Sequence, residues 1–228
     1  MAQIRKSFML AAAAAALVVG SATAATAAGT GIHSGSATGP LFGGNVKGSL
    51  LGTATVSTSV GGGSCNQSTM LGSVHSDGTA LTINSATFTN NPGPACPGGG
   101  GTVTVTAQSL PWSGGNVTYD GAHTGGRDAT VTIAGFKVRA DASIFGGITC
   151  YYGGSVTANG YNPNNPNRPD TTVAQAQIKL ANATINKIST GSNFLCPSTA
   201  TVTAAYQLQG ESSPGSGNYS LQLWVAAS

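Results

Sequence analysis

Apolar and polar residues alternate along most of the chain with the two-residue period of a β-strand. In residues 174–180 the apolar side chains fall on one face and Gln175, Gln177 and Lys179 on the other. This alternation is typical of a half-buried strand. Ten segments show it or a similar apolar run: 50–60, 69–74, 80–89, 102–107, 116–119, 129–139, 148–158, 174–180, 202–208 and 219–225.

Turn residues separate these segments. The stretch 76–79 contains Asp77-Gly78, which tolerates the positive φ angles of a two-residue hairpin turn. Residues 91–101 and 161–170 are rich in Pro, Gly and Asn and are expected to form long loops. Within 129–139 the apolar positions change from odd to even around Ala134-Gly135, which predicts a β-bulge there.

Many short strands joined by glycine-rich turns predict an all-β protein. We expect an antiparallel β-sandwich of about ten strands, jelly-roll or Ig-like, and the alternation does not separate these two topologies. Residues 29–48 lack periodicity, so we expect a flexible N-terminal leader. Residues 49–228 then form a single β-sandwich domain.

Residues 1–28 have the three parts of a secretory signal peptide. Arg5 and Lys6 precede an alanine-rich apolar run, and small residues at 22–27 offer two cleavage sites. The run is shorter than the roughly 18 to 20 residues that cross a bilayer, and no later stretch is longer. We therefore expect a secreted protein with no membrane span after cleavage, which should begin between Ala25 and Gly29.

The composition is poor in charge and rich in glycine. The 228 residues include 34 glycines but only 9 Lys+Arg and 6 Asp+Glu, with a formal net charge of +3. Loss of the signal peptide would leave about +1, because Arg5 and Lys6 would be removed. This excludes coiled coils, charged disordered tails and nucleic-acid binders, whose phosphate contacts need many basic side chains.

Four cysteines lie in the part expected to be exported. An even number in an oxidising compartment predicts two disulfides, for which three connectivities exist. We favour Cys65 with Cys96 and Cys150 with Cys196, because each pair then brackets a hairpin-like segment of one half of the chain. A zinc site is not indicated, since the chain has no C-x-x-C and its three histidines are scattered.

Three segments carry a family resemblance. They are Leu110-Pro111-Trp112, the segment CYYGG at 150–154, and Cys196-Pro197 with ATVTAAYQL at 200–208. Together they resemble small secreted actinobacterial proteins of unknown function, some of which are loosely similar to the alkane-oxidation activator family. The resemblance implies a secreted β-rich protein and assigns no active residue.

No constellation in the sequence predicts catalysis or a cofactor. The six carboxylates of the expected mature chain mostly stand beside turn residues, where Asp caps its own backbone. His75-Ser76-Asp77 are neighbours in a turn rather than a triad, and no G-x-S-x-G motif occurs. We therefore predict that the protein is not an enzyme.

Two features are candidates for binding. The loop from Asp120 to Asp128 contains two carboxylates and a histidine, a set that could hold Ca²⁺, although we favour an ordinary surface loop because it matches no calcium motif. Trp112, Tyr151 and Tyr152 are candidates for lining a groove for a sugar or a hydrocarbon.

Three functions fit the sequence. The first, which we favour, is a non-catalytic structural or interaction module with an extracellular or cell-wall partner. The second is an extracellular binding protein for apolar or carbohydrate ligands, and the third and least favoured is a secreted hydrolase. The sequence leaves the ligand, the partner and the oligomeric state open.

Overall fold

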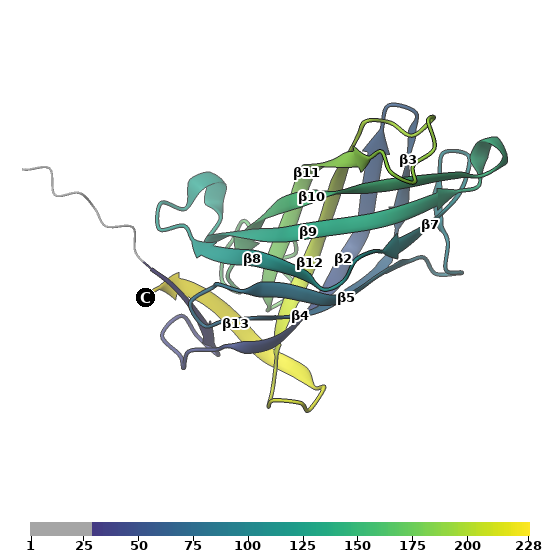
Figure 1. The fold of residues 1–228 in the computed structure, drawn as a ribbon. Helices are drawn as coiled ribbons and strands as arrows, with labels where there is room; N and C mark the ends of the chain where they lie inside the picture. Colours follow the sequence, from purple (N-terminus) through teal and green to yellow (C-terminus); the bar gives the residue numbers. More distant parts are fainter. Residues whose placement is uncertain (1–28) are drawn as a thin grey trace, which may run out of the picture.

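The computed structural model describes residues 29–228, so the expected signal peptide lies outside the described residues. This part of the chain consists of thirteen strands with two short 3-10 turns, η1 (Thr124–Gly126) and η2 (Ile144–Gly146). All ten expected strands are present (Figure 1). The strands are β1 (Thr30–Ser34), β2 (Gly44–Thr58), β3 (Gly61–Cys65), β4 (Gln67–Val74), β5 (Leu81–Thr89), β6 (Cys96–Gly98), β7 (Gly101–Ala107), β8 (Trp112–Tyr119), β9 (Ala129–Ala142), β10 (Ile148–Tyr161), β11 (Ala176–Ile188), β12 (Thr199–Glu211) and β13 (Tyr219–Ala227).

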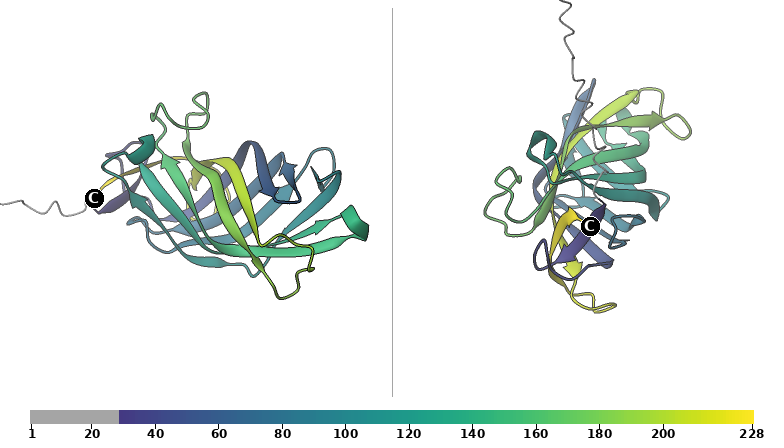
Figure 2. Two further views of the ribbon diagram at one scale, coloured as in Figure 1. Left: turned by 90° about the horizontal axis from the view of Figure 1, so that it is seen from above. Right: turned by 90° about the vertical axis from the view of Figure 1, so that its left-hand side faces the viewer.

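The strands close into an antiparallel barrel, so the expected sandwich is wrong. β12 pairs with β11 on one side and with β2 on the other, and β2 leads through β4, β5, β8, β9 and β10 back to β11. Toward the other end, β3, β6 and β7 connect β2 to β9. Figure 1 shows β9 and β10 in front of β12 and β2, and Figure 2 shows the same strands from two further sides.

The sequence could not separate a barrel from a sandwich, because both place alternate side chains inward. The difference lies in one pairing between strands far apart in the chain. β12 joins β2 along registers such as Thr203 with Thr55 and Gln207 with Ser49. Through this pairing, β2 and β12 are not left as free sheet edges.

Two local predictions are confirmed. In β9, the register against β10 shifts so that Ala134 and Gly135 together oppose Ser155, which is the expected bulge. Gly135 has a φ of +69°, and Phe136 and Ile133 on either side of the bulge are both buried. The bulge therefore returns the second half of β9 to the same core.

The hairpin between β4 and β5 forms as predicted. Asp77 accepts hydrogen bonds from the backbone N–H and the hydroxyl of Thr79, and these bonds lower the pKa of Asp77. Gly78 has a φ of +79°, and a Cβ there would collide with the carbonyl of Val117. Only glycine therefore fits this turn.

Residues 29–48 belong to the fold rather than to a leader. β1 pairs with β13 from Thr30 with Ala227 to Ser34 with Leu223, and Ile32 and Phe42 are buried. β2 already begins at Gly44. Because this stretch packs against the end of the barrel through isolated apolar residues, it has no two-residue period to reveal it.

Two further strands were not expected from the sequence. β3 has the sequence GGGSC and β6 has CPG, so neither carries an apolar pattern. Both are held by their neighbours, since β3 pairs with β2 and β6 pairs with β7. The expected loop at 91–101 consequently contains a short strand.

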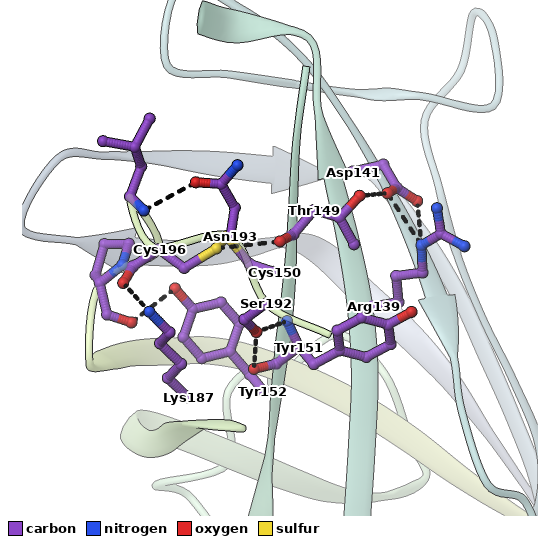
Figure 3. Close-up of a disulfide and its surroundings, with 12 residues drawn as sticks. Arg139, Asp141, Thr149, Cys150, Tyr151, Tyr152, Lys187, Ser192, Asn193 and Cys196 are labelled. Atoms are coloured by element: carbon purple, nitrogen blue, oxygen red, sulfur yellow. Dashed lines mark hydrogen bonds and ion pairs between the residues drawn. A yellow bond between two sulfur atoms is a disulfide. The ribbon is translucent and has the colours of Figure 1, made fainter. Parts of the chain in front are cut away.

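The predicted disulfide pairing is confirmed. Cys65 and Cys96 join β3 to β6, with 4.9 Å between their Cα atoms. Cys150 and Cys196 join β10 to the connection between β11 and β12, with a Cα distance of 5.7 Å (Figure 3). Disulfides persist in oxidising environments, which is consistent with an extracellular location.

Glu211 at the end of β12 makes the stability of the fold depend on pH. Its carboxylate accepts hydrogen bonds from Gly217 N at 2.6 Å, Asn45 Nδ2 at 2.8 Å and Gly215 N at 3.1 Å. These bonds, with that from Gly217 the largest cause, hold the pKa of Glu211 below its usual 4.5. A depressed folded-state pKa contributes stability above the unfolded value and loses it as the pH falls through the folded value.

We therefore expect the melting temperature to fall when the pH is lowered from about 5 to about 3. Glu211→Gln should show a shallower fall over the same range, because the amide does not titrate. Melting curves followed by circular dichroism at several pH values measure both slopes. Identical slopes for the two proteins would contradict this role of Glu211.

Candidate ligand-binding cavity

The interior of the barrel is not completely filled. Valine, isoleucine and tyrosine side chains from the inward positions of the long strands leave a cavity of about 180 Å³. Its walls include Val56 from β2, Val105 from β7, Val138 from β9, Tyr152 from β10 and Ile185 from β11. The cavity extends toward the end of the barrel where β2 turns into β3.

A second cavity of about 110 Å³ lies further along the same interior. Its walls include Val46 from β2, Leu81 from β5, Val131 from β9, Ile178 from β11 and Leu223 from β13. Both linings are almost entirely apolar. Apolar space of this size is large enough for a small apolar molecule such as benzene.

Met70 and Tyr206 border both cavities. Met70 points inward from β4 and Tyr206 from β12, and both are buried. Gly48 of β2 lies between these two strands, with its Cα opposite Met70 and Leu208 in the register. The phenol of Tyr206 reaches across β2 to Ser68 of β4, since β12 and β4 both pair with β2.

The phenol of Tyr206 ends at Ser68. The two hydroxyl oxygens lie 3.0 Å apart, and the residues are only 2% and 6% exposed. Burial raises the pKa of Tyr206 to about 12. The phenol therefore stays protonated at neutral pH and remains a hydrogen-bond donor or acceptor.

The three aromatic residues expected to form one groove do not come together. Trp112 is only 1% exposed and packs on Phe136, with a ring-centroid distance of 4.7 Å. Tyr152 points into the barrel, whereas Tyr151 lies on the outer side of β10, and Figure 3 shows the two rings on opposite sides of the strand. Of the three, only Tyr152 lines one of the two cavities.

The loop from Asp120 to Asp128 uses its carboxylates to hold its own shape. Asp120 accepts hydrogen bonds from Arg127 Nε at 2.7 Å and from the backbone N–H of Thr124. Desolvation raises the pKa of Asp120, but the bonds from Arg127 and Thr124 outweigh it, so the pKa lies below 3.8. The interactions of Asp120 are therefore those of a structural turn.

Asp128 is engaged in the same way. Its carboxylate accepts hydrogen bonds from Asn162 N and Asn165 Nδ2, both at 2.7 Å, and lies 3.1 Å from His123 Nδ1. These contacts join the loop to the β10–β11 connection. Among residues 29–228, no three His, Cys, Asp or Glu side chains are grouped closely enough to hold a metal ion.

The sequence pointed to Tyr152 but missed Ser68, Met70 and Tyr206. Alternation in residues 202–208 places Tyr206 on the same face as Val202 and Ala204, yet a position on the apolar face normally means core packing. No sequence pattern records that the surrounding side chains leave space.

Within the part of the chain that the structure describes, no helix is long and apolar enough to cross a membrane.

Comparison with protein-family models, with curated proteins and with solved structures gave no match for this chain.

Proposed function

We propose that this chain is a secreted, non-catalytic binding protein that holds a small uncharged apolar molecule inside its barrel. The observation that carries the proposal is the apolar cavity of about 180 Å³. An apolar cavity of about 150 Å³ is large enough for benzene. Natural cores are packed almost without voids of this size, because unfilled space costs stability.

The lining selects against charged ligands. Its side chains come mainly from Val, Ala, Ile and Phe, and no Lys, Arg, Asp or Glu is among them. Moving an unpaired charge into such surroundings is very unfavourable. An apolar ligand gains instead from leaving water, by about 25 cal/mol for each Å² of apolar surface buried.

Melting curves with benzene, cyclohexane and the charged analogue benzoate test this function. We expect the two neutral compounds to raise the melting temperature, because a ligand at about 100 times its Kd stabilises the native state by about 2.7 kcal/mol. For a domain of this size, that corresponds to a rise of roughly 5 to 10 °C. Benzoate should give no rise.

Filling the cavity should abolish the effect. Val138→Phe on β9 and Val56→Phe on β2 each place a larger ring into the space from a different wall. Lys137→Phe is the matched control, because Lys137 neighbours Val138 on the opposite face of β9. A rise in melting temperature that survives in both filled variants would refute the cavity as the binding site.

The same experiment separates this proposal from a purely structural or interaction module. If neither neutral compound raises the melting temperature, the interaction module becomes the better account. Phe194, at 86% exposure, and the neighbouring exposed Leu195 are then the surface to examine for an extracellular or cell-wall partner.

A further inference from the structure

The hydroxyl groups of Ser68 and Tyr206 have one hydrogen that takes part in no hydrogen bond. Two hydroxyl groups hold two hydrogens, and the single bond between them, 3.0 Å long, uses one. Among the described residues neither hydroxyl has a second side-chain or backbone partner. One O–H group is therefore left without an acceptor in the interior.

An unpaired buried donor is unfavourable, because it has lost its hydrogen bond to water without gaining another. Each oxygen of the pair has one partner, but the remaining hydrogen has no acceptor in an otherwise apolar interior. An acceptor oxygen on a bound ligand would supply the missing partner. The protonated state of Tyr206, with its pKa raised by burial, keeps the donor available.

The position of this donor limits where the ligand's oxygen can be. Tyr206 borders both the cavity of about 180 Å³ and the cavity of about 110 Å³. A ligand whose oxygen meets the hydroxyl pair therefore has space for apolar atoms on both sides. Together the two cavities provide about 290 Å³, nearly twice the volume that holds benzene.

Met70 is the other side chain between the two cavities. Methionine is unbranched and has three rotatable bonds, so it adapts its shape to fill or vacate irregular space. A change of its rotamer can connect the two cavities without moving the strand.

We propose that the ligand is an elongated aliphatic molecule with one uncharged acceptor oxygen near its middle, bound across both cavities with that oxygen on the Ser68–Tyr206 hydroxyl pair. This rests on the proposed function and names the chemical class that the same site takes. A dialkyl ketone is the simplest member of the class.

Two isomeric ketones test the placement of the oxygen. Nonan-5-one and nonan-2-one have the same atoms and nearly the same apolar surface, but only the first has a central carbonyl. We expect nonan-5-one to bind about tenfold more tightly by calorimetry, since a hydrogen bond to an otherwise unpaired donor is worth about that factor. Equal affinities would overturn the assignment of the hydroxyl pair.

Removing the donors should remove this preference. The double variant Ser68→Ala/Tyr206→Phe keeps the ring and deletes both hydroxyls, so the two isomers should then bind equally. Tyr151→Phe is the matched control, because Tyr151 lies on the outer side of β10 and lines neither cavity. The control should keep the tenfold preference.

The span across both cavities is tested at Met70. Met70→Ile replaces a flexible side chain by a β-branched one with restricted χ1. We expect nonan-5-one to bind at least tenfold more weakly to this variant. Unchanged affinity for nonan-5-one would show that the ligand occupies one cavity only.

Binding of benzene and of nonan-5-one to the wild-type protein separates a failure of this inference from a failure of the proposed function. If benzene binds in the wild-type protein and nonan-5-one does not, the elongated ligand is excluded and the apolar binding site stands. If neither binds, both proposals fall.

Discussion

Replacing Cys150 and Cys196 together by serine is expected to lower the free energy of unfolding by about 4 kcal/mol. The two cysteines are 46 residues apart, so their disulfide removes much of the freedom of the unfolded chain between β10 and β12. For a domain of about 200 residues, the expected fall in melting temperature is roughly 8 to 16 °C.

Loss of this disulfide is also expected to loosen the folded structure around Cys196. The carbonyl of Cys196 accepts a hydrogen bond from Lys187 Nζ at 3.0 Å, and that of the next residue, Pro197, accepts one from Tyr152 (Figure 3). Cys150, Tyr152 and Pro197 all line the larger cavity. Loss of the disulfide should therefore also weaken binding of apolar ligands there.

Denaturant unfolding of the oxidised wild type and of the double serine variant measures this prediction. The corresponding variant of Cys65 and Cys96, which are 31 residues apart, is the natural comparison and should lose slightly less. A loss below about 1 kcal/mol at Cys150 and Cys196 would contradict the expected contribution.

Trp112→Ala is expected to destabilise the protein by about 3 to 5 kcal/mol. Trp112 begins β8, is 1% exposed, and stacks at a tilt on Phe136 beside the bulge of β9. Its indole Nε1 donates a hydrogen bond to the carbonyl of Gln108 at 2.8 Å. Removing the ring leaves a void against Phe136 and a carbonyl without this donor.

Trp224→Ala provides the control for this effect. Trp224 is only partly buried, and its indole donates to the side chain of Gln222 on the same strand. We expect a loss of about 1 kcal/mol, typical of a single substitution outside the core. Equal losses for the two tryptophans in denaturant unfolding would show that Trp112 is not the anchor described here.

Local features of the fold follow from residues that are close in sequence. The hairpin at Asp77-Gly78 and the bulge at Ala134-Gly135 depend on backbone angles and on alternation within a few residues. The disulfide pairing could be predicted because each pair brackets one segment of the chain. In these cases the residues that determine the local structure lie within one segment of the chain.

The candidate site is different, since it is defined by space between side chains from several strands. Tyr206 and Ser68 are 138 residues apart and meet because β12 and β4 both pair with β2. Trp112 and Tyr152 also point inward, but the first is fully packed and the second borders a cavity. Sequence alternation gives the direction of a side chain and says nothing about how completely its surroundings are filled.

The sequence by itself determined that this is an all-β protein with ten recognisable strands, their principal turns, one bulge and two disulfides, because each depends on local periodicity or on cysteine spacing. Only the tertiary structure decided that the sheet closes through β2 and β12, that residues 29–48 join it, and that its interior holds cavities around Met70 and Tyr206. The physical reason is that closure and packing depend on contacts between distant segments, which alternation permits but does not specify.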